Sequence, residues 1–308
     1  MIAFVFPGQG SQYVGMGKEL YNDFAVAKNI FEEANDSLGF DLAALCFEGE
    51  QSELSLTANA QPALLTTSIA CLVVLKSETS LIPNFVAGHS LGEYTALVAN
   101  WAISLSDAVK TVRKRGEFMQ EAAPVGIGAM AAVLGLDKEK VEDICNQVSQ
   151  NGLIASPANL NAPGQTVISG NTQAIEEASS IAKTEGAKRV VPLDVSAPFH
   201  CALMEPAAQR LSEFLNEVNI REMDSPIVVN CTASVNNDSS KVKELLVSQV
   251  TSPVRWYESV ETLKNEGCNN FIEIGPKNVL SGLIKRTLSD VTVNKLEKLA
   301  RLESINNG

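Results

Sequence analysis

The chain has 308 residues, 45% of them hydrophobic, so it can bury a large core in one large domain or in two smaller ones. Its 24 basic and 36 acidic residues give a formal net charge of -12, which argues against nucleic acid or an anionic membrane as the main partner. An anionic ligand would therefore have to meet a local group of cations.

The cysteines and the N-terminal segment indicate where the protein works. The apolar run Ile2–Phe6 has no basic segment before it and is followed at once by Pro7 and Gly8, so it is predicted to be a strand and not a signal peptide. No stretch approaches the roughly 20 continuous apolar residues of a membrane helix. The six cysteines show no CxxC pair and no metal-ligand spacing, which is typical of reduced, buried thiols in the cytosol. They are Cys46, Cys71, Cys145, Cys201, Cys231 and Cys268. We expect a soluble, cytoplasmic protein with no membrane partner.

Strand-like and helical runs alternate in the first part of the chain. The apolar strand at 2–6 is followed by a long helix at 18–35, an apolar helix at 62–76 and a short apolar run at 85–87. This alternation predicts an α/β architecture with a largely parallel sheet.

Ser90 is the centre of a GxSxG motif, Gly88-His89-Ser90-Leu91-Gly92, which lies directly after the apolar run 85–87 and before a helix-like run. This is the sequence form of a nucleophile elbow, in which the glycines allow a sharp turn and leave the serine clear at its apex. The helix that follows offers unpaired N-terminal amides to a developing oxyanion. A GxSxG motif alone is a moderate signal of acyl chemistry, and its position between strand and helix strengthens it.

Arg115 lies on the apolar side of a helix predicted over 107–122. An advance of about 100° per residue puts it on one stripe with Ala108, Val112, Met119 and Ala122. A guanidinium there loses its hydration and needs an anionic partner. That partner is either an internal Asp or Glu, which is the commoner arrangement, or the carboxylate or phosphate of a substrate.

Residues 124–195 show a different order of predicted strands and helices. Strands are predicted at 129–136, 154–160, 165–169 and 188–195, with helices at 138–149 and 172–185. The order βαββαβ is the ferredoxin-like pattern, which predicts a small subdomain inserted at 124–195. The remaining residues, 1–123 and 196–308, then form the main domain. In that second part we expect a strand at 227–231, a helix at 241–250, another after Ser252 and Pro253, a strand at 270–274, and a tail after Asp290 with only a short amphipathic stretch.

His200 is the better of two candidates for a general base, because a serine hydroxyl needs a base within hydrogen-bond reach. The only other histidine, His89, is adjacent to Ser90 inside the elbow, where its side chain should point away. His200 follows Pro198 and Phe199 in a turn at the return from the small subdomain, from which a side chain can enter a cleft. The alternative is a surface or core histidine with no catalytic role.

The loop Phe6-Pro7-Gly8-Gln9-Gly10-Ser11-Gln12 joins the first strand to a helix. A nucleotide-binding GxGxxG motif would need glycine at position 13, which is Tyr13, and no GxxxxGK[ST] motif matches. We expect the loop to supply a backbone amide to an oxyanion hole beside the elbow.

Five segments in this order resemble the malonyl-CoA:acyl-carrier-protein transacylase family of bacterial-type fatty acid synthesis. The match runs from residue 1 to about residue 287, and five ordered motifs are far more specific than one. The segments are Phe6 to Gln12, Gly88 to Glu93, Arg115-Gly116-Glu117-Phe118-Met119-Gln120, Pro198-Phe199-His200 and Glu273-Ile274-Gly275-Pro276. The resemblance implies an α/β-hydrolase-like domain with an inserted ferredoxin-like subdomain. The run Gly275-Pro276-Lys277-Asn278 departs from the GPGK that is common in the family.

The resemblance also implies a role for individual positions. Ser90 would be the acylated nucleophile, His200 its general base and later acid, and Gln249 the residue whose backbone carbonyl orients the histidine. The backbone amides of Gln9 and Leu91 would form the oxyanion hole, and Arg115 would pair with the free carboxylate of a malonyl group. Gln61 resembles a polar residue near the pocket, and Phe199 resembles the malonyl-selecting form of its turn. The positions implied are thus Ser90, His200, Gln249, Gln9, Leu91, Arg115, Gln61 and Phe199.

The predicted function is transfer of malonyl from malonyl-CoA to the phosphopantetheine thiol of holo acyl carrier protein, through a malonyl-serine and with ping-pong kinetics. We expect no metal and no bound cofactor. We expect the protein to be a monomer. The carrier protein is acidic, so docking needs local cations. The candidates are Lys183, Lys188, Arg189, Lys285 and Arg286. The alternatives are a serine hydrolase or thioesterase, against which more than 100 residues after His200 argue, and a non-catalytic carrier-binding subunit.

Overall fold

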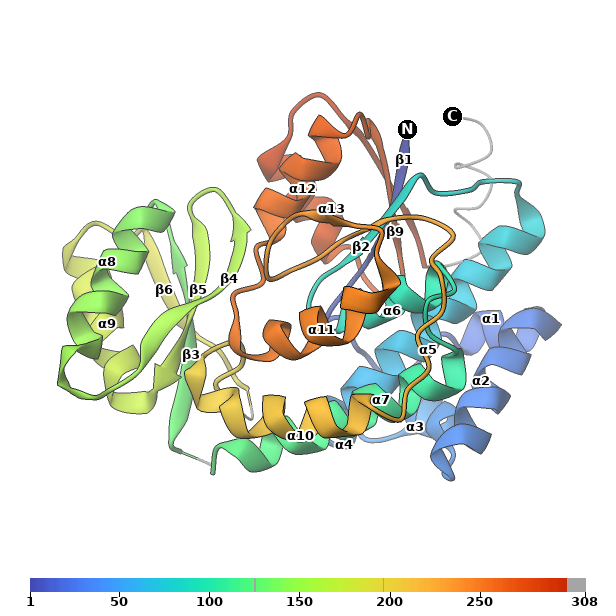
Figure 1. The fold of residues 1–308 in the computed structure, drawn as a ribbon, viewed down its shortest axis with the longest axis horizontal. Coiled ribbons are helices and arrows are strands. Elements are labelled where there is room, and N and C mark those ends of the chain that lie inside the picture. Colours follow the sequence, from blue (N-terminus) through green and yellow to red (C-terminus); the bar gives the residue numbers. More distant parts are fainter. Residues whose placement is uncertain (125, 196, 298–308) are drawn as a thin grey trace.

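Two β-sheets organise the computed structural model, which describes residues 1–124, 126–195 and 197–297 (Figure 1). Within these residues the larger sheet has six strands in the order β10-β9-β1-β2-β7-β8. The strands are β1 (Ile2–Phe6), β2 (Phe85–Gly88), β7 (Ile227–Val228), β8 (Val235–Asn236), β9 (Asn270–Ile274) and β10 (Thr292–Leu296). All neighbouring strands run parallel except β7 and β8. The prediction of an α/β fold with a largely parallel sheet is therefore confirmed.

The central strand β1 shows how the larger sheet is stabilised. Its residues alternate between two hydrophobic clusters, with Phe4 and Phe6 in one and Ala3 and Val5 in the other. Successive side chains of a strand point to opposite faces, so β1 is covered by helices on both sides. Such a buried strand must be apolar throughout, as the sequence of β1 is.

The helices before the elbow differ from the expected pattern. They are α1 (Lys18–Asp23), α2 (Ala25–Leu38), α3 (Leu42–Glu48), α4 (Gln51–Ser55) and α5 (Thr57–Glu78). The single helix expected at 18–35 was wrong, because Phe24 adopts an extended backbone with φ -127° and ψ 119° and separates α1 from α2. The short helices α3 and α4 were not predicted.

Helix α5 begins five residues before the proline at which it was expected to start. Pro62 lies inside the helix and has no N–H to donate to the carbonyl of Ala58. Arg113 Nη1 donates to that carbonyl over 3.1 Å instead. Among the described residues, α5 has the length and composition of a membrane-crossing helix, but 83% of its most apolar window is buried inside the protein. It packs against α2, α6 (Leu91–Ala99) and α7 (Leu105–Ala122), as a core helix does.

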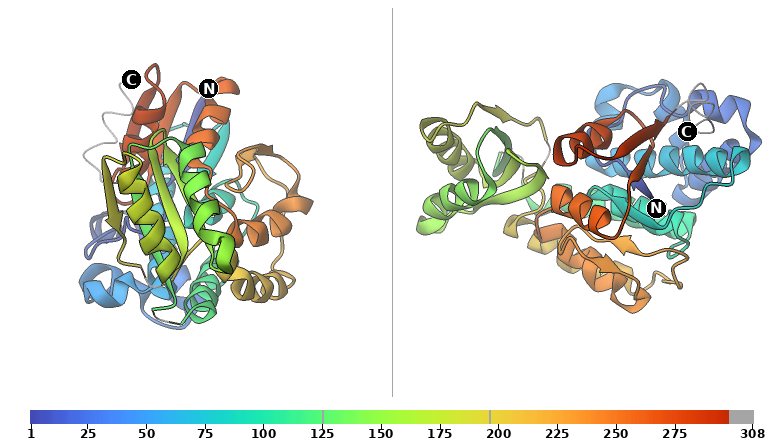
Figure 2. Two further views of the ribbon diagram at one scale, coloured as in Figure 1. Left: turned by 90° about the vertical axis from the view of Figure 1, so that its left-hand side faces the viewer. Right: turned by 90° about the horizontal axis from the view of Figure 1, so that it is seen from above.

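The smaller sheet lies to one side of the larger one and has the strand order β4-β5-β3-β6, with all neighbours antiparallel (Figure 1). Its elements follow the order β3 (Gly128–Leu134), α8 (Lys138–Val148), β4 (Ala155–Ala162), β5 (Gln165–Asn171), α9 (Thr172–Thr184) and β6 (Arg189–Pro192). Figure 2 shows that α8 and α9 cover the face of this sheet that points away from the rest of the molecule. The opposite face is left to meet the larger sheet's helices and loops.

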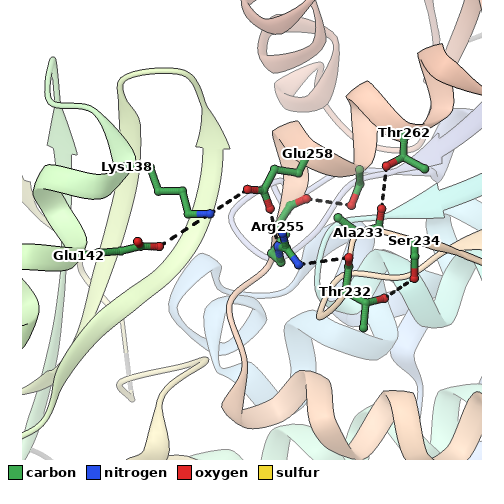
Figure 3. Close-up of polar contacts among 9 residues, drawn as sticks. Lys138, Glu142, Thr232, Ala233, Ser234, Arg255, Glu258 and Thr262 are labelled. Carbon is green, nitrogen blue, oxygen red and sulfur yellow. Dashed lines mark hydrogen bonds and ion pairs between the residues drawn. The ribbon is translucent and has the colours of Figure 1, made fainter.

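Strand β4 and helix α8 connect this sheet to the rest of the chain. Leu160 N–H donates to the carbonyl of Val254, and Val254 N–H donates to that of Ala158, both over 2.8 Å. Lys138 of α8 forms an ion pair of 2.9 Å with Glu258 of α12 (Trp256–Asn265). The carboxylate of Glu258 also contacts Arg255 (Figure 3). These contacts fix β4 beside the segment that precedes α12.

The C-terminal part of the described chain completes the larger sheet. Its helices are α10 (Glu205–Leu215), α11 (Val242–Thr251), α12 and α13 (Val279–Thr287). After Asp290 we expected a tail with only a short amphipathic stretch. This expectation was wrong, because the segment contains strand β10, which pairs in parallel with β9. Only Leu296 of this edge strand is fully buried, so its sequence carries little alternation. Residues 298–308 of the expected main domain lie outside the described residues.

The buried carboxylate of Glu273, at the end of β9, explains the Glu273 to Pro276 motif. Its oxygens accept hydrogen bonds from the backbone N–H of Leu280 over 3.0 Å and of Ser281 over 2.7 Å. The Ser281 hydroxyl donates to the same group over 2.6 Å. Glu273 therefore satisfies the unpaired amides at the start of α13 and ties that helix to the sheet.

All six cysteines are described and none forms a disulfide. Five are buried, as expected, and Cys231 is half-buried.

Candidate active site

Ser90 lies at the sharp turn between β2 and α6. Its backbone has φ 52° and ψ -105°, in the left-handed half of conformational space that non-glycine residues rarely adopt. A Cβ on Gly92 would lie 2.1 Å from the carbonyl oxygen of Phe6, and one on Gly88 would lie 1.9 Å from the backbone of Gly92. Only glycine fits at both positions, because β1 and the start of α6 approach each other there. The strained turn leaves the serine hydroxyl at the apex.

His200 is within hydrogen-bond reach of Ser90. Its Nε2 lies 2.8 Å from Ser90 Oγ, and its Nδ1 lies 2.9 Å from the backbone carbonyl oxygen of Gln249. A carbonyl only accepts, so Nδ1 carries the proton and the lone pair of Nε2 faces the serine hydroxyl. Burial, and then the positive charge of Arg115, lowers the pKa of His200 to about 3. The imidazole is therefore neutral near pH 7 and able to take a proton.

Arg115, on α7, is 2% exposed and points at the same hydroxyl. Its Nη2 donates to Ser90 Oγ over 3.0 Å and to Gln249 Oε1 over 2.9 Å, while Nη1 donates to Gln61 Oε1 over 2.8 Å. Among the described residues, no carboxylate forms an ion pair with this guanidinium. Of the two partners considered for Arg115, a direct internal Asp or Glu is thus not found among the described residues, and the groups that accept its hydrogen bonds are neutral.

The loop after β1 lies directly against the elbow. A Cβ on Gly8 would be 2.4 Å from the carbonyl oxygen of His89, so Gln9 follows a point of close backbone contact. Leu91 is the first residue of α6, and its N–H has no acceptor within the helix. The geometry thus brings the segments of both expected oxyanion amides to the turn that carries Ser90.

These side chains surround a cavity of about 450 Å³ between the two sheets. Gln9, Gln61, Ser90, Arg115, Phe199 and His200 line it, together with Met130 and Asn159 from the smaller sheet. The volume suits a small acyl group with part of its carrier. Gln249 is fully buried and Leu91 is 1% exposed, so these two support the cavity wall from behind.

Sequence reasoning missed two polar residues at this site. Glu93, in the first turn of α6, accepts a hydrogen bond from the backbone N–H of Asn230 over 2.8 Å. The Asn230 side chain in turn accepts from the backbone N–H of Ser90 over 2.7 Å and donates to the carbonyl of Gly88 over 2.7 Å. A carboxylate on the otherwise apolar run of α6 was a usable signal for Glu93. Asn230 had none, because its role depends on where β7 ends.

His89 points away from Ser90, as expected. Its Nε2 lies 2.8 Å from Asn161 Oδ1 on β4, and its ring packs beside Trp256 of α12. Among the described residues, no group of three or more His, Cys, Asp or Glu side chains is arranged to hold a metal ion.

The five candidate docking cations are all exposed. Lys183 lies in the last turn of α9, and Lys285 and Arg286 lie in the last turn of α13. Arg286 Nη1 donates to Gln165 Oε1 over 2.6 Å, which brings α13 next to β5. Lys188 precedes β6, and Arg189 is its first residue.

Known proteins resemble this chain over nearly its whole length. The model of the acyl transferase domain family matches residues 3–303. The malonyl CoA-acyl carrier protein transacylase of Bacillus subtilis (strain 168) is 53% identical over 301 residues, covering 97% of this chain and 95% of the relative. The chain belongs to the malonyl CoA-acyl carrier protein transacylase family.

Solved structures of this transacylase family share the whole fold. The acyl-carrier-protein S-malonyltransferase of Burkholderia pseudomallei 1710b has a TM-score of 0.97 at 44% identity, covering 100% of this chain and 99% of that one. The malonyl-transacylase PlMCAT, solved in complex with the type II PKS acyl-carrier protein AntF in its holo form, has a TM-score of 0.97 at 42% identity, with coverage of 100% and 99%. The second of these was solved with a carrier protein bound.

Proposed function

We propose that the protein transfers a malonyl group from malonyl-CoA to the phosphopantetheine thiol of an acyl carrier protein, through an ester on Ser90. The observation that carries this proposal is the hydrogen bond of 3.0 Å between Arg115 Nη2 and Ser90 Oγ. It places a buried cation next to the nucleophile, where the free carboxylate of a malonyl group attached to Ser90 would lie. Membership of the transacylase family supports the same substrate pair.

In the first half-reaction, the Ser90 hydroxyl gives its proton to His200 Nε2 as its oxygen attacks the thioester carbonyl of malonyl-CoA. The negative charge of the tetrahedral intermediate is stabilised by the backbone amides of Leu91 and Gln9. The C–S bond then breaks, His200 returns the proton to the departing thiolate, and a malonyl ester remains on Ser90. The Gln249 carbonyl accepts from Nδ1–H both in the neutral imidazole and in the imidazolium, which fixes the tautomer of the neutral form and the orientation of the ring.

In the second half-reaction, the phosphopantetheine thiol of the carrier protein gives its proton to His200 and attacks the malonyl ester. The intermediate collapses with cleavage of the bond to Ser90 Oγ, which recovers its proton from His200. The kinetics are ping-pong, because coenzyme A leaves before the carrier's thiol reacts. No group outside the chain and the two substrates takes part in these steps.

Arg115 also favours transfer over the hydrolase alternative. A charge-assisted bidentate pair with the malonyl carboxylate contributes about 1.5 to 3 kcal/mol, whereas simple ester hydrolysis has no use for a buried cation beside its nucleophile. The base is oriented by a carbonyl oxygen at 2.9 Å and not by a carboxylate. We infer that Gln61 holds Arg115 in place and that Phe199 limits room for a branched acyl group.

We infer further that residues 1–123 and 196–308 form an α/β-hydrolase-like domain and that 124–195 is an inserted ferredoxin-like subdomain. The βαββαβ order of the smaller sheet and its strand order support this division. The cavity then lies between the two units. We propose a cytoplasmic monomer that needs no cofactor, consistent with thiols that carry no disulfide.

Intact-protein mass spectrometry after mixing with malonyl-CoA tests the function. An adduct of about 86 Da, as expected for a malonyl ester, should map to Ser90, be absent from Ser90→Ala, and disappear when holo acyl carrier protein is added. Rapid loss of the adduct in water without carrier would indicate a hydrolase. Absence of the adduct from the wild-type protein would overturn the proposal and favour a non-catalytic subunit.

A further inference from the structure

Glu93 is a buried carboxylate that the proposed reaction does not use. It is 1% exposed and lies three residues after the nucleophile in the first turn of α6. Its Oε2 accepts hydrogen bonds from the backbone N–H of Asn230 over 2.8 Å and from Gln249 Nε2 over 3.0 Å. A buried ionised carboxylate is costly without a countercharge. The guanidinium of Arg115 supplies such a countercharge nearby, without direct contact with Glu93.

The side-chain amide of Gln249 lies between Glu93 and Arg115. Its Oε1 accepts from Arg115 Nη2 over 2.9 Å, and its Nε2 donates to Glu93 and, over 3.1 Å, to the carbonyl oxygen of Ser90. The order is therefore guanidinium, amide, carboxylate, and each hydrogen bond between neighbours runs from an N–H to an oxygen. Burial is the largest influence on both groups, since it raises the pKa of Glu93 and lowers the pKa of Arg115. The two charges nevertheless attract each other, because Arg115 lowers the pKa of Glu93 and Glu93 raises that of Arg115.

This arrangement separates two requirements of a site that binds a carboxylate. A carboxylate in direct contact with Arg115 would take the N–H groups that a substrate carboxylate needs. With no countercharge at all, the buried guanidinium would be strongly destabilising. Glu93 provides the countercharge across the intervening neutral amide of Gln249, which leaves the cavity side of Arg115 facing Ser90 and Gln61.

We propose that Glu93 is a positioning residue that serves as the resident countercharge of Arg115 and, through the Gln249 side chain, keeps its guanidinium aimed into the cavity. This inference rests on the proposed function, in which Arg115 pairs with the malonyl carboxylate. The empty site then carries one positive and one negative charge, and the acyl carboxylate adds a second negative charge. Glu93 therefore weakens malonyl binding while it stabilises the empty protein.

Two substitutions separate the charge of Glu93 from its hydrogen bonds. Glu93→Gln keeps the shape and a carbonyl that can accept from Gln249, but removes the negative charge. We expect it to raise the ratio of kcat/KM for malonyl-CoA over acetyl-CoA by roughly 3- to 10-fold through a lower KM for malonyl-CoA. Glu93→Met offers only a thioether sulfur, which is a weak acceptor, so the amide of Gln249 is held less firmly, Arg115 loses its alignment and the same ratio falls.

The experiment measures Ser90 acylation by malonyl-CoA and by acetyl-CoA, which lacks the free carboxylate. It is run at pH 8, since burial raises the pKa of Glu93 to about 7 and the group must be ionised. Glu32→Gln on the exposed face of α2 makes the same change in net charge and should leave the ratio unchanged.

A raised ratio in Glu93→Gln supports the inference. An unchanged or lowered ratio in that variant overturns it, whatever Glu93→Met does and even if Glu93→Met fails to fold. A merely structural role would lower kcat for both acyl groups alike and leave the ratio where it is in the wild type. Failure of malonyl-CoA to acylate the wild-type protein would overturn the proposed function together with this inference, so the two failures are distinguishable.

Discussion

Arg115 and His200 contact the same atom from two sides, since Arg115 Nη2 and His200 Nε2 lie 3.0 Å and 2.8 Å from Ser90 Oγ. The hydroxyl donates its proton to the neutral imidazole and accepts from the guanidinium with a lone pair. An acyl carboxylate that binds Arg115 competes with Ser90 for the same N–H. Recognition of the acyl group and activation of the nucleophile are thereby linked at one oxygen.

Arg115→Ala should abolish the preference for malonyl without abolishing acyl transfer. The substitution removes a charge-assisted pair, and we expect malonyl-CoA to lose roughly 10- to 150-fold in kcat/KM relative to acetyl-CoA. Acylation of Ser90 by both thioesters, followed by mass spectrometry, measures the ratio. Persistence of the wild-type preference in Arg115→Ala would show that another group recognises the carboxylate.

Arg115→Lys is the matched control for charge alone. An ammonium is a point charge on a flexible stem and cannot reproduce the planar fork that contacts Gln61, Ser90 and Gln249. We expect an intermediate ratio, closer to that of Arg115→Ala. Full activity in the lysine variant would mean that charge, and not bidentate geometry, sets the preference.

As the pH is lowered, activity should not fall until the pH is well below the pKa usual for histidine. Because burial and then Arg115 lower the pKa of His200 to about 3, its Nε2 remains free to accept a proton at pH 5. The rate of Ser90 acylation from pH 5 to 8 measures this, with His200→Ala expected to lose about 100- to 10,000-fold at every pH. With acetyl-CoA as the donor, which lacks the carboxylate that senses the charge of Glu93, a fall in rate centred near pH 6.5 would contradict the low pKa of His200.

The same depressed pKa should make the fold less stable in acid. Between about pH 3 and 6.5 the unfolded chain binds a proton at His200 that the native state does not, so the contribution of His200 to stability falls as the pH falls through this window, while the raised pKa of Glu93 acts in the opposite sense. At pH 5 the loss is about 2 kcal/mol relative to pH 7.5. Urea unfolding at both pH values should show a smaller difference in His200→Gln, and equal differences would contradict the argument.

Much of the site could be anticipated because its signals are local. The GxSxG turn, the apolar strand before it and the presence of only two histidines are all read within short segments. Arg115 was recognisable because the helical period places it among apolar residues, which the structure shows as a guanidinium 2% exposed. The alternation of strand-like and helical runs likewise predicted the largely parallel sheet.

The parts that escaped prediction depend on contacts between distant segments. The hydrogen bond from Arg115 to the side chain of Gln249 joins residues 134 positions apart in the sequence, and no pattern in the sequence of α11 predicts it. Strand β10 is an edge strand with one fully buried residue, so its pairing with β9 leaves no clear alternation. Of the two partners considered for Arg115, the internal carboxylate is present only indirectly, since the amide of Gln249 separates Arg115 from Glu93. Sequence patterns therefore predict which side chains are buried better than they predict which residues those side chains contact.

Gly92→Ala should damage the elbow far more than its small size suggests. The added Cβ would lie 2.1 Å from the carbonyl oxygen of Phe6, so β1 or α6 must move. We expect a loss of about 1 to 3 kcal/mol in the free energy of unfolding and slower acylation of Ser90. Gly282→Ala on α13 is the matched control, because its Cβ would meet no described heavy atom within 4 Å, and it should stabilise the helix by about 0.5 to 1 kcal/mol. Similar effects of the two substitutions would contradict the steric argument.

The Lys138–Glu258 ion pair should contribute measurably to holding the smaller sheet against α12. Its side chains are 23% and 16% exposed, so screening by water is incomplete, and Arg255 contacts the same carboxylate (Figure 3). A double-mutant cycle of Lys138→Met and Glu258→Gln should give a coupling of about 0.5 to 1 kcal/mol in the free energy of unfolding. Glu258→Gln should cost more than Lys138→Met, because it deprives two cations of their partner. A coupling of zero would mean that this ion pair does not help to hold the smaller sheet beside the active-site cavity.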